Sequence, residues 1–131
     1  MPHRFHKHYT LEEARALLPQ VRGWLKQIQE IRERLRQLED RLGQLLAGGV
    51  DAAGGASVNS QIKLLAELQA VMHEFTQREI QIKDLSRGLV DFPAIIGGRE
   101  VFLCWEQDDE DIEFWHDLEA GYAGRARLPE A

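Results

Sequence analysis

Glu113 and His116 stand three positions apart, next to a run of acidic residues. On a helix, side chains with this spacing face the same way, as in the Glu-x-x-His pairs of carboxylate-bridged metal sites. Such a centre needs ligands from other elements, and Asp91 is the carboxylate that we expect beside it. The metal candidates are therefore Asp91, Glu113 and His116, and the cofactor that this pattern indicates is a divalent metal.

The same histidine is suited to acid–base chemistry. A carboxylate that contacts His116 raises its basicity and prepares it as a general base. The catalytic candidates are Asp84, Asp91, His116 and Arg125, the last of which can orient an anion. The structural alternative is that Trp115 packs in the core while His116 hydrogen-bonds a backbone carbonyl at a sheet edge. A single histidine among scattered acids favours this alternative.

Three further features carry possible ligands or nucleophiles, but we expect none of them to form a site. Cys104 stands among apolar residues, where the pKa of a thiol is raised, so a packing role is favoured. His3, His6 and His8 include metal-binding side chains, yet nothing nearby in the sequence fixes their geometry, and we expect them to be mobile. The stretch HEFTQ (73–77) lacks the second histidine of the zinc-protease motif.

The composition indicates an ordinary globular chain. Its 131 residues, 44% of them hydrophobic, suit a single domain over 1–131. One cysteine excludes an internal disulfide, and the N-terminal stretch lacks the apolar core of a secretory signal, so we expect a cytoplasmic protein. No apolar run approaches the roughly 18 residues of a membrane-spanning helix.

Charge is unevenly spread along the chain. Residues 1–46 hold nine Lys and Arg against six Asp and Glu (+3), 47–99 hold five against six (−1), and 100–131 hold two against ten (−8), which gives the net charge of −6. The acidic end would repel a polyanion, and acids interleave with the arginines of the first helix. We therefore expect no nucleic-acid partner.

Helical patterns occupy the first half of the chain. Thr10 and Glu13 form a capping box that predicts a helix start, and Pro19 predicts a kink or break soon afterwards. Apolar residues then recur in heptad spacing at Ile28, Ile31, Leu35, Leu38, Leu42 and Leu45. A glycine-rich stretch, 47–58, predicts a flexible connector to a second helix over 59–79. Together, 10–46 and 59–79 predict a long antiparallel helical hairpin.

The second half is typical of strands. Alternating and β-branched residues over 80–105 predict a small antiparallel sheet, with Gly97-Gly98 as a two-residue hairpin turn. Counting from that turn pairs Asp91 with Cys104 on one face. It places Val90, Phe92, Ala94, Ile96, Val101, Leu103 and Trp105 on the opposite, core face. Residues 106–131 are expected to form an acidic loop, a short C-terminal helix near 109–118 and a tail. The fold class is therefore α+β.

Three blocks resemble one known family. YTLEEARALLP, IKDLSRGLVDFPA, and REVFLCW followed by IEFWHDLEAGYAGR are similar to the bacterial domain of unknown function family 2203. The resemblance implies no established activity. It implies a set of matching positions: Lys83, Asp84, Gly88, Asp91, Phe92, Pro93, Cys104, Trp105, Trp115, His116, Gly121, Gly124 and Arg125. The acidic loop has Glu106, Asp108 and Glu110 where members carry Arg, Gly and Pro, which argues against anion binding there.

Two functions from different classes follow from these patterns. The first is a non-enzymatic interaction module that binds a protein partner or a second copy of itself through the helical hairpin. It is favoured because the heptad stripe is the strongest signal and no catalytic set is complete. The alternative is a small metal-binding or acid–base enzyme with its site at the sheet edge around Asp91 and His116.

Overall fold

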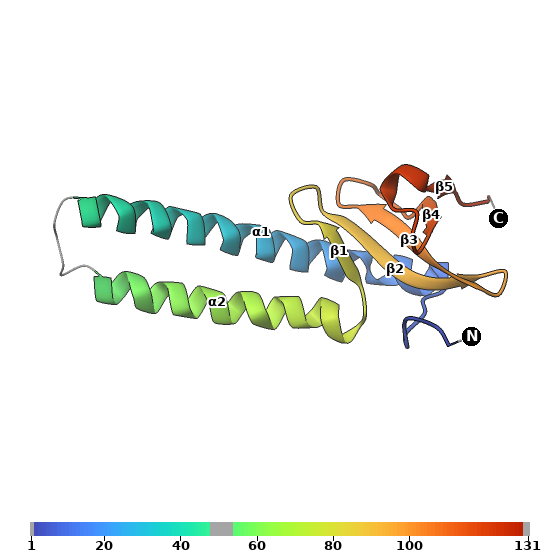
Figure 1. Cartoon of the computed structure of the whole chain (residues 1–131), viewed down its shortest axis with the longest axis horizontal. Coiled ribbons are helices and arrows are strands. Elements are labelled where there is room, and N and C mark those ends of the chain that lie inside the picture. The colour runs from blue at the N-terminus through green and yellow to red at the C-terminus, as the bar shows by residue number, and fades with distance from the viewer. Residues whose placement is uncertain (1, 48–53, 130–131) are drawn as a thin grey trace. The chain divides into compact units, whose positions relative to one another are not determined.

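The computed structural model describes residues 2–47 and 54–129, which form two helices followed by five strands (Figure 1). In chain order the elements are α1 (Leu11–Ala47), α2 (Gly54–Gln77), β1 (Gln81–Asp84), β2 (Leu89–Ile96), β3 (Arg99–Glu106), β4 (Phe114–Asp117), a 3-10 turn (Tyr122–Gly124) and β5 (Ala126–Arg127). The predicted α+β class is confirmed.

The predicted capping box forms at the start of α1. The Thr10 N–H donates to the Glu13 carboxylate at 2.9 Å, and the Glu13 N–H donates to the Thr10 hydroxyl at 3.1 Å. The helix continues through Pro19 without a break. α2 begins at Gly54, so residues 54–58 of the predicted connector 47–58 belong to the helix instead. Residues 48–53 of that connector lie outside the described residues.

The chain divides into two compact units. One contains Met1–Leu25 and Glu74–Ala131, and the other is Lys26–His73, formed by the later part of α1 and most of α2. Within the second unit, Ile28, Ile31, Leu64 and Val71 are buried. The other heptad positions described, Leu35, Leu38 and Leu42, are half-buried. The packing of the two helices as a hairpin stays a prediction.

The five strands form one antiparallel sheet in the order β1-β2-β3-β4-β5. The predicted β2–β3 register is confirmed, because Ile96 pairs with Arg99 and Asp91 pairs with Cys104. Gly97 and Gly98 both have positive φ, 59° and 78°, as a two-residue turn of this kind requires. Local turn chemistry thus sets the pairing of the two longest strands.

Both faces of the β2–β3 hairpin are buried. The predicted core face is confirmed except at Ile96, which is 38% exposed near the end of the hairpin. On the other face Asp91, Phe102 and Cys104 are each about 1% exposed. A carboxylate and a thiol therefore lie opposite one another in the interior, where an ionised group is costly unless it is paired.

The predicted C-terminal helix near 109–118 is wrong. Phe114–Asp117 is instead the strand β4, which pairs with β3 on one side and with β5 on the other. The free edge of β3 offers hydrogen bonds to an extended segment, and the aromatic residues at 114 and 115 favour that conformation. The acidic loop before β4 is held by α1: Arg22 donates to the Asp109 carbonyl at 2.5 Å, and Arg15 pairs with Asp111 at 2.6 Å.

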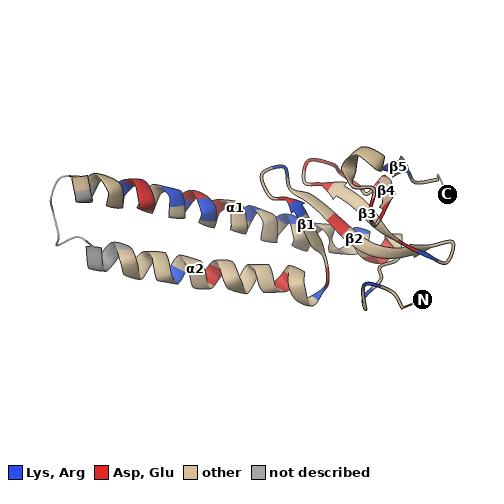
Figure 2. Cartoon of the chain, in the orientation of Figure 1, with Lys and Arg blue, Asp and Glu red and all other residues tan. Residues whose placement is uncertain are grey.

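Acidic and basic residues interleave along α1 (Figure 2). Arg36 pairs with Glu33 at 2.5 Å and with Asp40 at 2.9 Å, one turn away on either side. Such pairs neutralise much of the helix's positive charge. Over the residues described, neither α1 nor α2 has an apolar stretch of the length that crossing a membrane requires.

Candidate functional site

Asp91 and His116 meet in the interior of the sheet. Asp91 lies on β2 and His116 on β4, and the strand β3 lies between them. The Nε2 atom of His116 is 2.9 Å from Oδ2 of Asp91, and both side chains are 2% exposed. Two of the residues predicted from the sequence are therefore in direct contact, with little exposure to bulk solvent.

The neighbours of His116 fix where its protons lie. Nδ1 is 2.8 Å from the carbonyl oxygen of Asp117, which can only accept, so Nδ1 carries a hydrogen and donates. A single further proton then occupies the hydrogen bond between Nε2 and the Asp91 carboxyl. Burial raises the pKa of Asp91, while the charge and hydrogen bond of His116 act to lower it. The pair thus shares one proton and carries no net charge in either arrangement.

One atom of this pair has no partner. Asp91 Oδ1 is buried and accepts no N–H or O–H hydrogen bond from the described part of the chain, although the Cys104 thiol, a weak donor, interacts with the same carboxylate. Buried carboxylate oxygens without a donor are rare in folded proteins because their desolvation is uncompensated. A water, a cation or a small ligand can supply the partner that such an oxygen needs.

Cys104 completes a set of three donor atoms. A carboxylate oxygen of Asp91, the Cys104 sulfur and a ring nitrogen of His116 all lie within 4.8 Å of one another, and all three residues are buried. Burial raises the pKa of the Cys104 thiol to about 12, and the neighbouring Asp91 carboxylate contributes to that rise. The prediction that Cys104 is buried and is not a nucleophile is in keeping with this pKa.

A cavity opens beside the three residues. It has a volume of about 210 Å³, and its lining consists of Lys83, Leu89, Asp91, Cys104, His116, Leu118, Gly121 and Tyr122. The ammonium of Lys83 lies 4.7 Å from the centre of the Phe102 ring and its charge acts on Asp91. The space is several times the volume of a water molecule, so it can hold water or a small ligand next to the donor atoms.

Two arginines flank the cavity at Tyr122. Arg125 lies 4.1 Å from the Tyr122 ring and 3.9 Å from the Phe114 ring, and it is close enough to Cys104 to act against the rise in the thiol pKa. Arg87 lies 4.4 Å from the Tyr122 ring and pairs with Glu106 at 2.7 Å. Among the described residues, Lys83 is the cationic side chain in the cavity lining, and the two arginines lie against Tyr122, another lining residue.

Two of the predicted residues lie elsewhere. Asp84 ends β1 and accepts hydrogen bonds from the Ser86 hydroxyl at 2.8 Å and the Arg87 N–H at 3.2 Å, which lower the pKa of Asp84. Its role in the structure is to hold the turn before β2. Glu113 is exposed and lies 3.8 Å from Arg127. Because β4 replaces the predicted helix, Glu113 and His116 do not share a helical face, and Cys104 takes the place expected for Glu113.

Three polar residues of the cavity lining, Cys104, Lys83 and Tyr122, were not among the site candidates named from the sequence. Cys104 was assigned to packing, although its predicted pairing opposite Asp91 was the signal that places it there. Lys83 lies at an irregularity of the β1–β2 pairing, and Tyr122 lies in the 3-10 turn. Neither the irregular pairing at Lys83 nor the 3-10 turn at Tyr122 has a recognisable pattern in the sequence.

Comparison with known proteins supports the resemblance stated from the sequence. Residues 7–128 match the family described as "Uncharacterized conserved protein (DUF2203)". No curated protein and no solved structure gives a significant match to the chain. The matched range covers the cavity and its donor set, and the chain belongs to this family of uncharacterized conserved proteins, domain of unknown function family 2203.

Proposed function

We propose that the protein binds a divalent transition metal, with zinc as the best match, through Asp91, Cys104 and His116. The observation that carries the proposal is the convergence of three buried donor atoms from three neighbouring strands, with Asp91 Oδ1 left unsatisfied. One nitrogen, one sulfur and one oxygen form a ligand set of the kind that zinc accepts. The proposal keeps Asp91 and His116 of the metal candidates and replaces Glu113 with Cys104.

The hydrogen bond of His116 to the Asp117 carbonyl supports this role. Metal-binding histidines commonly donate one ring N–H to a carbonyl or carboxylate, which orients the ring and leaves the other nitrogen for the metal. Here Nδ1 makes the 2.8 Å bond and Nε2 points to Asp91. A metal ion held by Nε2 and the Asp91 carboxylate would take the place of the shared proton.

The cavity supports a catalytic rather than a structural metal. Structural zinc is enclosed by four protein ligands, whereas catalytic zinc has three and leaves one position open. The cavity of about 210 Å³ is lined by all three donor residues, so it offers space for such an open position. A metal held by these residues would lower the pKa of a bound water, so metal-assisted hydrolysis is the reaction class that we propose. Lys83 and Arg125 supply positive charge for a small anionic substrate.

Metal affinity is expected to depend on pH. Binding displaces the proton shared by Asp91 and His116 and also the thiol proton of Cys104, whose pKa is about 12. Affinity therefore increases as pH rises through the neutral range. The thiol must also stay reduced, as it would in the cytoplasmic location expected from the sequence.

Cobalt substitution tests the proposal directly. A cobalt ion bound to a thiolate gives a charge-transfer absorption that nitrogen and oxygen ligands do not produce. We expect this band in the untagged wild-type protein, its loss in Cys104→Ser and its weakening in His116→Gln. Glu113→Gln is the matched control, since Glu113 was predicted from the sequence but lies on the surface, and it should keep the band.

The absence of a thiolate band in folded wild-type protein contradicts the metal proposal. The Asp91–His116 pair then remains as a metal-free acid–base site, because one shared proton between a carboxyl and an imidazole suits proton transfer. Elemental analysis of the same samples checks that zinc or another metal did not already fill the site before cobalt was added.

A second candidate function is self-association through α2. Four large apolar side chains on this helix are exposed: Val58 (43%), Ile62 (60%), Leu65 (48%) and Met72 (38%). Their spacing of four, three and seven residues places them on one face in heptad register, and the buried Leu64 and Val71 lie on a different face, about 100° around the helix from Leu65 and Met72. This row is the specific surface that supports the interaction module predicted from the sequence.

A second copy of the chain is the occupant that we propose for this row. Asn59, Gln61 and Gln69 border or interrupt it, so two such faces meet without repulsion between like charges. Light scattering over a concentration series should show a dimer that Ile62→Lys or Leu65→Lys converts to a monomer. Lys63→Glu, which changes charge beside the row but removes no apolar contact, should leave the dimer intact. A strictly monomeric wild type contradicts this candidate.

A further inference from the structure

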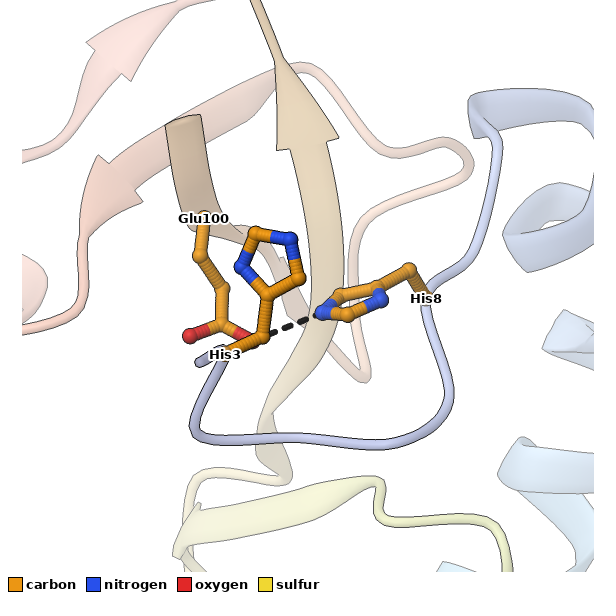
Figure 3. Close-up of side chains that lie close together, drawn as sticks. All are labelled: His3, His8 and Glu100. Carbon is orange, nitrogen blue, oxygen red and sulfur yellow. Dashed lines mark hydrogen bonds and ion pairs between the residues drawn. The ribbon is translucent and has the colours of Figure 1, made fainter. Parts of the chain in front are cut away.

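Two histidines of the segment before α1 meet a glutamate of the sheet (Figure 3). His8 Nε2 lies 2.7 Å from Oε2 of Glu100, near the start of β3. The rings of His3 and His8 contact edge to face, with centroids 5.0 Å apart. One ligand atom from each of His3, His8 and Glu100 lies within 4.8 Å of the other two.

The segment that carries these histidines is anchored to the sheet. The N–H groups of Arg4 and Phe5 donate to the two Glu100 oxygens at 2.8 and 3.0 Å, and the Phe5 ring contacts Phe102. Farther along, the N–H of Tyr9 donates to the Pro93 carbonyl at 2.7 Å. The expectation of a mobile tail was wrong for this reason: the fixed geometry comes from β2 and β3, which are distant in the sequence.

We infer that His3, His8 and Glu100 form a second divalent-metal site, open to solvent and separate from Asp91, Cys104 and His116. Two imidazoles and one carboxylate suit zinc, nickel or copper, and the lack of a sulfur ligand distinguishes this site from the buried one. His3 is exposed, whereas His8 and Glu100 are half-buried, so water completes the coordination on the outer side.

The charges around the cluster permit a cation. Glu100 contributes the carboxylate, and the Arg4 guanidinium is paired with Glu119. The other cation of this segment, the Lys7 ammonium, lies over the Tyr9 ring, 5.2 Å from its centre. A metal ion inserted between His8 Nε2 and Glu100 Oε2 takes the place of the proton of their hydrogen bond, and His3 then closes the site. Binding is therefore also expected to tie the segment before α1 more firmly to β3.

His6 provides a matched control within the same short segment. Its backbone N–H donates to the Glu79 carboxylate at 2.9 Å, and its side chain is not part of the donor cluster. A metal that merely collects on a histidine-rich segment depends on His6 as much as on His3. A built site depends on His3 and His8 and not on His6.

Zinc titration by calorimetry tests the inference. The protein is prepared without a histidine tag and in the Cys104→Ser background, which removes a ligand of the buried site. We expect one zinc per chain, an affinity at least about tenfold weaker in His3→Ala and in His8→Ala, and unchanged binding in His6→Ala. Equal losses in His3→Ala and His6→Ala, or no loss in His3→Ala, overturn the inference.

Cobalt spectra of the otherwise wild-type chain give a second readout if Cys104→Ser does not fold. The inferred site binds cobalt through nitrogen and oxygen only, so His3→Ala should reduce the total cobalt bound while the thiolate band is kept. Loss of that band in His3→Ala, or undiminished total binding, overturns the inference. If the buried site at Asp91, Cys104 and His116 binds no metal, the thiolate band is already missing in the wild-type protein, so the two outcomes can be told apart.

Discussion

His116 Nε2 and Asp91 Oδ2 lie 2.9 Å apart across the strand that separates them, at 2% exposure on both sides. The two side chains share a single proton, because the other ring nitrogen donates to the Asp117 carbonyl. Removing either partner leaves the other buried without its counterpart, which costs more than the hydrogen bond itself contributes.

This contact predicts strong coupling between Asp91 and His116 in stability. In the presence of a chelator, we expect Asp91→Asn and His116→Gln each to lower the free energy of unfolding by about 1–3 kcal/mol. The double variant should lose less than the sum of the two, with a coupling energy of about 1 kcal/mol or more. Urea denaturation measures all four proteins of the cycle.

Glu113→Gln serves as the control for that cycle. Its side chain is 57% exposed and lies 3.8 Å from Arg127, so its loss should change stability by no more than about 0.5 kcal/mol. Strict additivity of Asp91→Asn and His116→Gln would show that the two residues do not share the proton.

The parts of the fold that were predicted correctly depend on local chemistry. The Thr10–Glu13 capping box and the Gly97-Gly98 turn are each specified by adjacent residues, and the turn alone determines that Asp91 lies opposite Cys104. β4 could not be predicted in this way. Four residues are too few to show an alternating pattern, and the free edge of β3 decides their conformation.

The candidate site was predicted in part, and for a partly wrong reason. His116 was expected on a helix with Glu113, whereas it lies on β4, in register with Phe102 and within reach of Asp91. Asp84 was expected beside Asp91, but the bulge between Ile82 and Asp84 pairs Asp84 with Leu89 at the end of β1. Where a strand slips by one residue, its alternation no longer says which side chains share a face.

Gly88 is expected to be the glycine least tolerant of substitution in the sheet unit. Its φ is +66°, and a β-carbon there would lie 2.4 Å from Cβ of Gln107, an atom fixed close to the backbone. We expect Gly88→Ala to lower the free energy of unfolding by about 2 kcal/mol or more, since the left-handed backbone and the clash both contribute.

Gly97→Ala separates these two effects. Gly97 has a φ of +59°, but no atom lies within 4 Å of the position of its β-carbon. Only the backbone contribution applies, and we expect a loss of about 1 kcal/mol. Thermal denaturation compares the two variants, and an equal loss in both would argue against a steric role for Gln107.

The Cys104 thiol predicts a loss of stability at alkaline pH. Burial raises its pKa from 9.0 to about 12, so the folded protein holds this proton more tightly than the unfolded chain does. Its stabilising contribution is complete below pH 9 and is lost as pH rises from 9 toward 12. Cys104→Ala should therefore show a shallower fall in the free energy of unfolding over that range, measured by urea denaturation in chelator.

Tyr9→Phe is the comparison for Cys104→Ala. Burial also raises the pKa of Tyr9, whose hydroxyl donates to the Arg78 carbonyl at 2.8 Å, so Tyr9 contributes to the alkaline loss in the same direction. Each variant should make the fall in the free energy of unfolding with rising pH less steep, and the double variant should do so more than either single variant. An unchanged slope in Cys104→Ala would mean that the thiol ionises alike in the folded and unfolded chains.

Glu100 predicts a separate loss of structure at acidic pH, confined at first to the segment before α1. Partial burial acts to raise its pKa, but the hydrogen bonds from His8 and from the Phe5 and Arg4 N–H groups outweigh it and lower the pKa from 4.5 to about 2. Because the folded-state pKa is the lower one, its contribution is complete above pH 4.5 and is lost as pH falls toward 2. In chelator, the backbone amide resonances of Arg4 and Phe5 should shift over this range before those of the sheet.

Glu100→Gln removes the charged acceptor for both amides, so the variant should show the acid-form resonances of Arg4 and Phe5 already at neutral pH. Glu119→Gln is the control, since Glu119 contacts Arg4 only through an exposed ion pair and accepts nothing from these N–H groups. It should preserve the wild-type pH profile. Arg4 and Phe5 resonances that shift only together with global unfolding would mean that Glu100 does not anchor the segment, and the geometry that brings His3 to His8 would then lack its support.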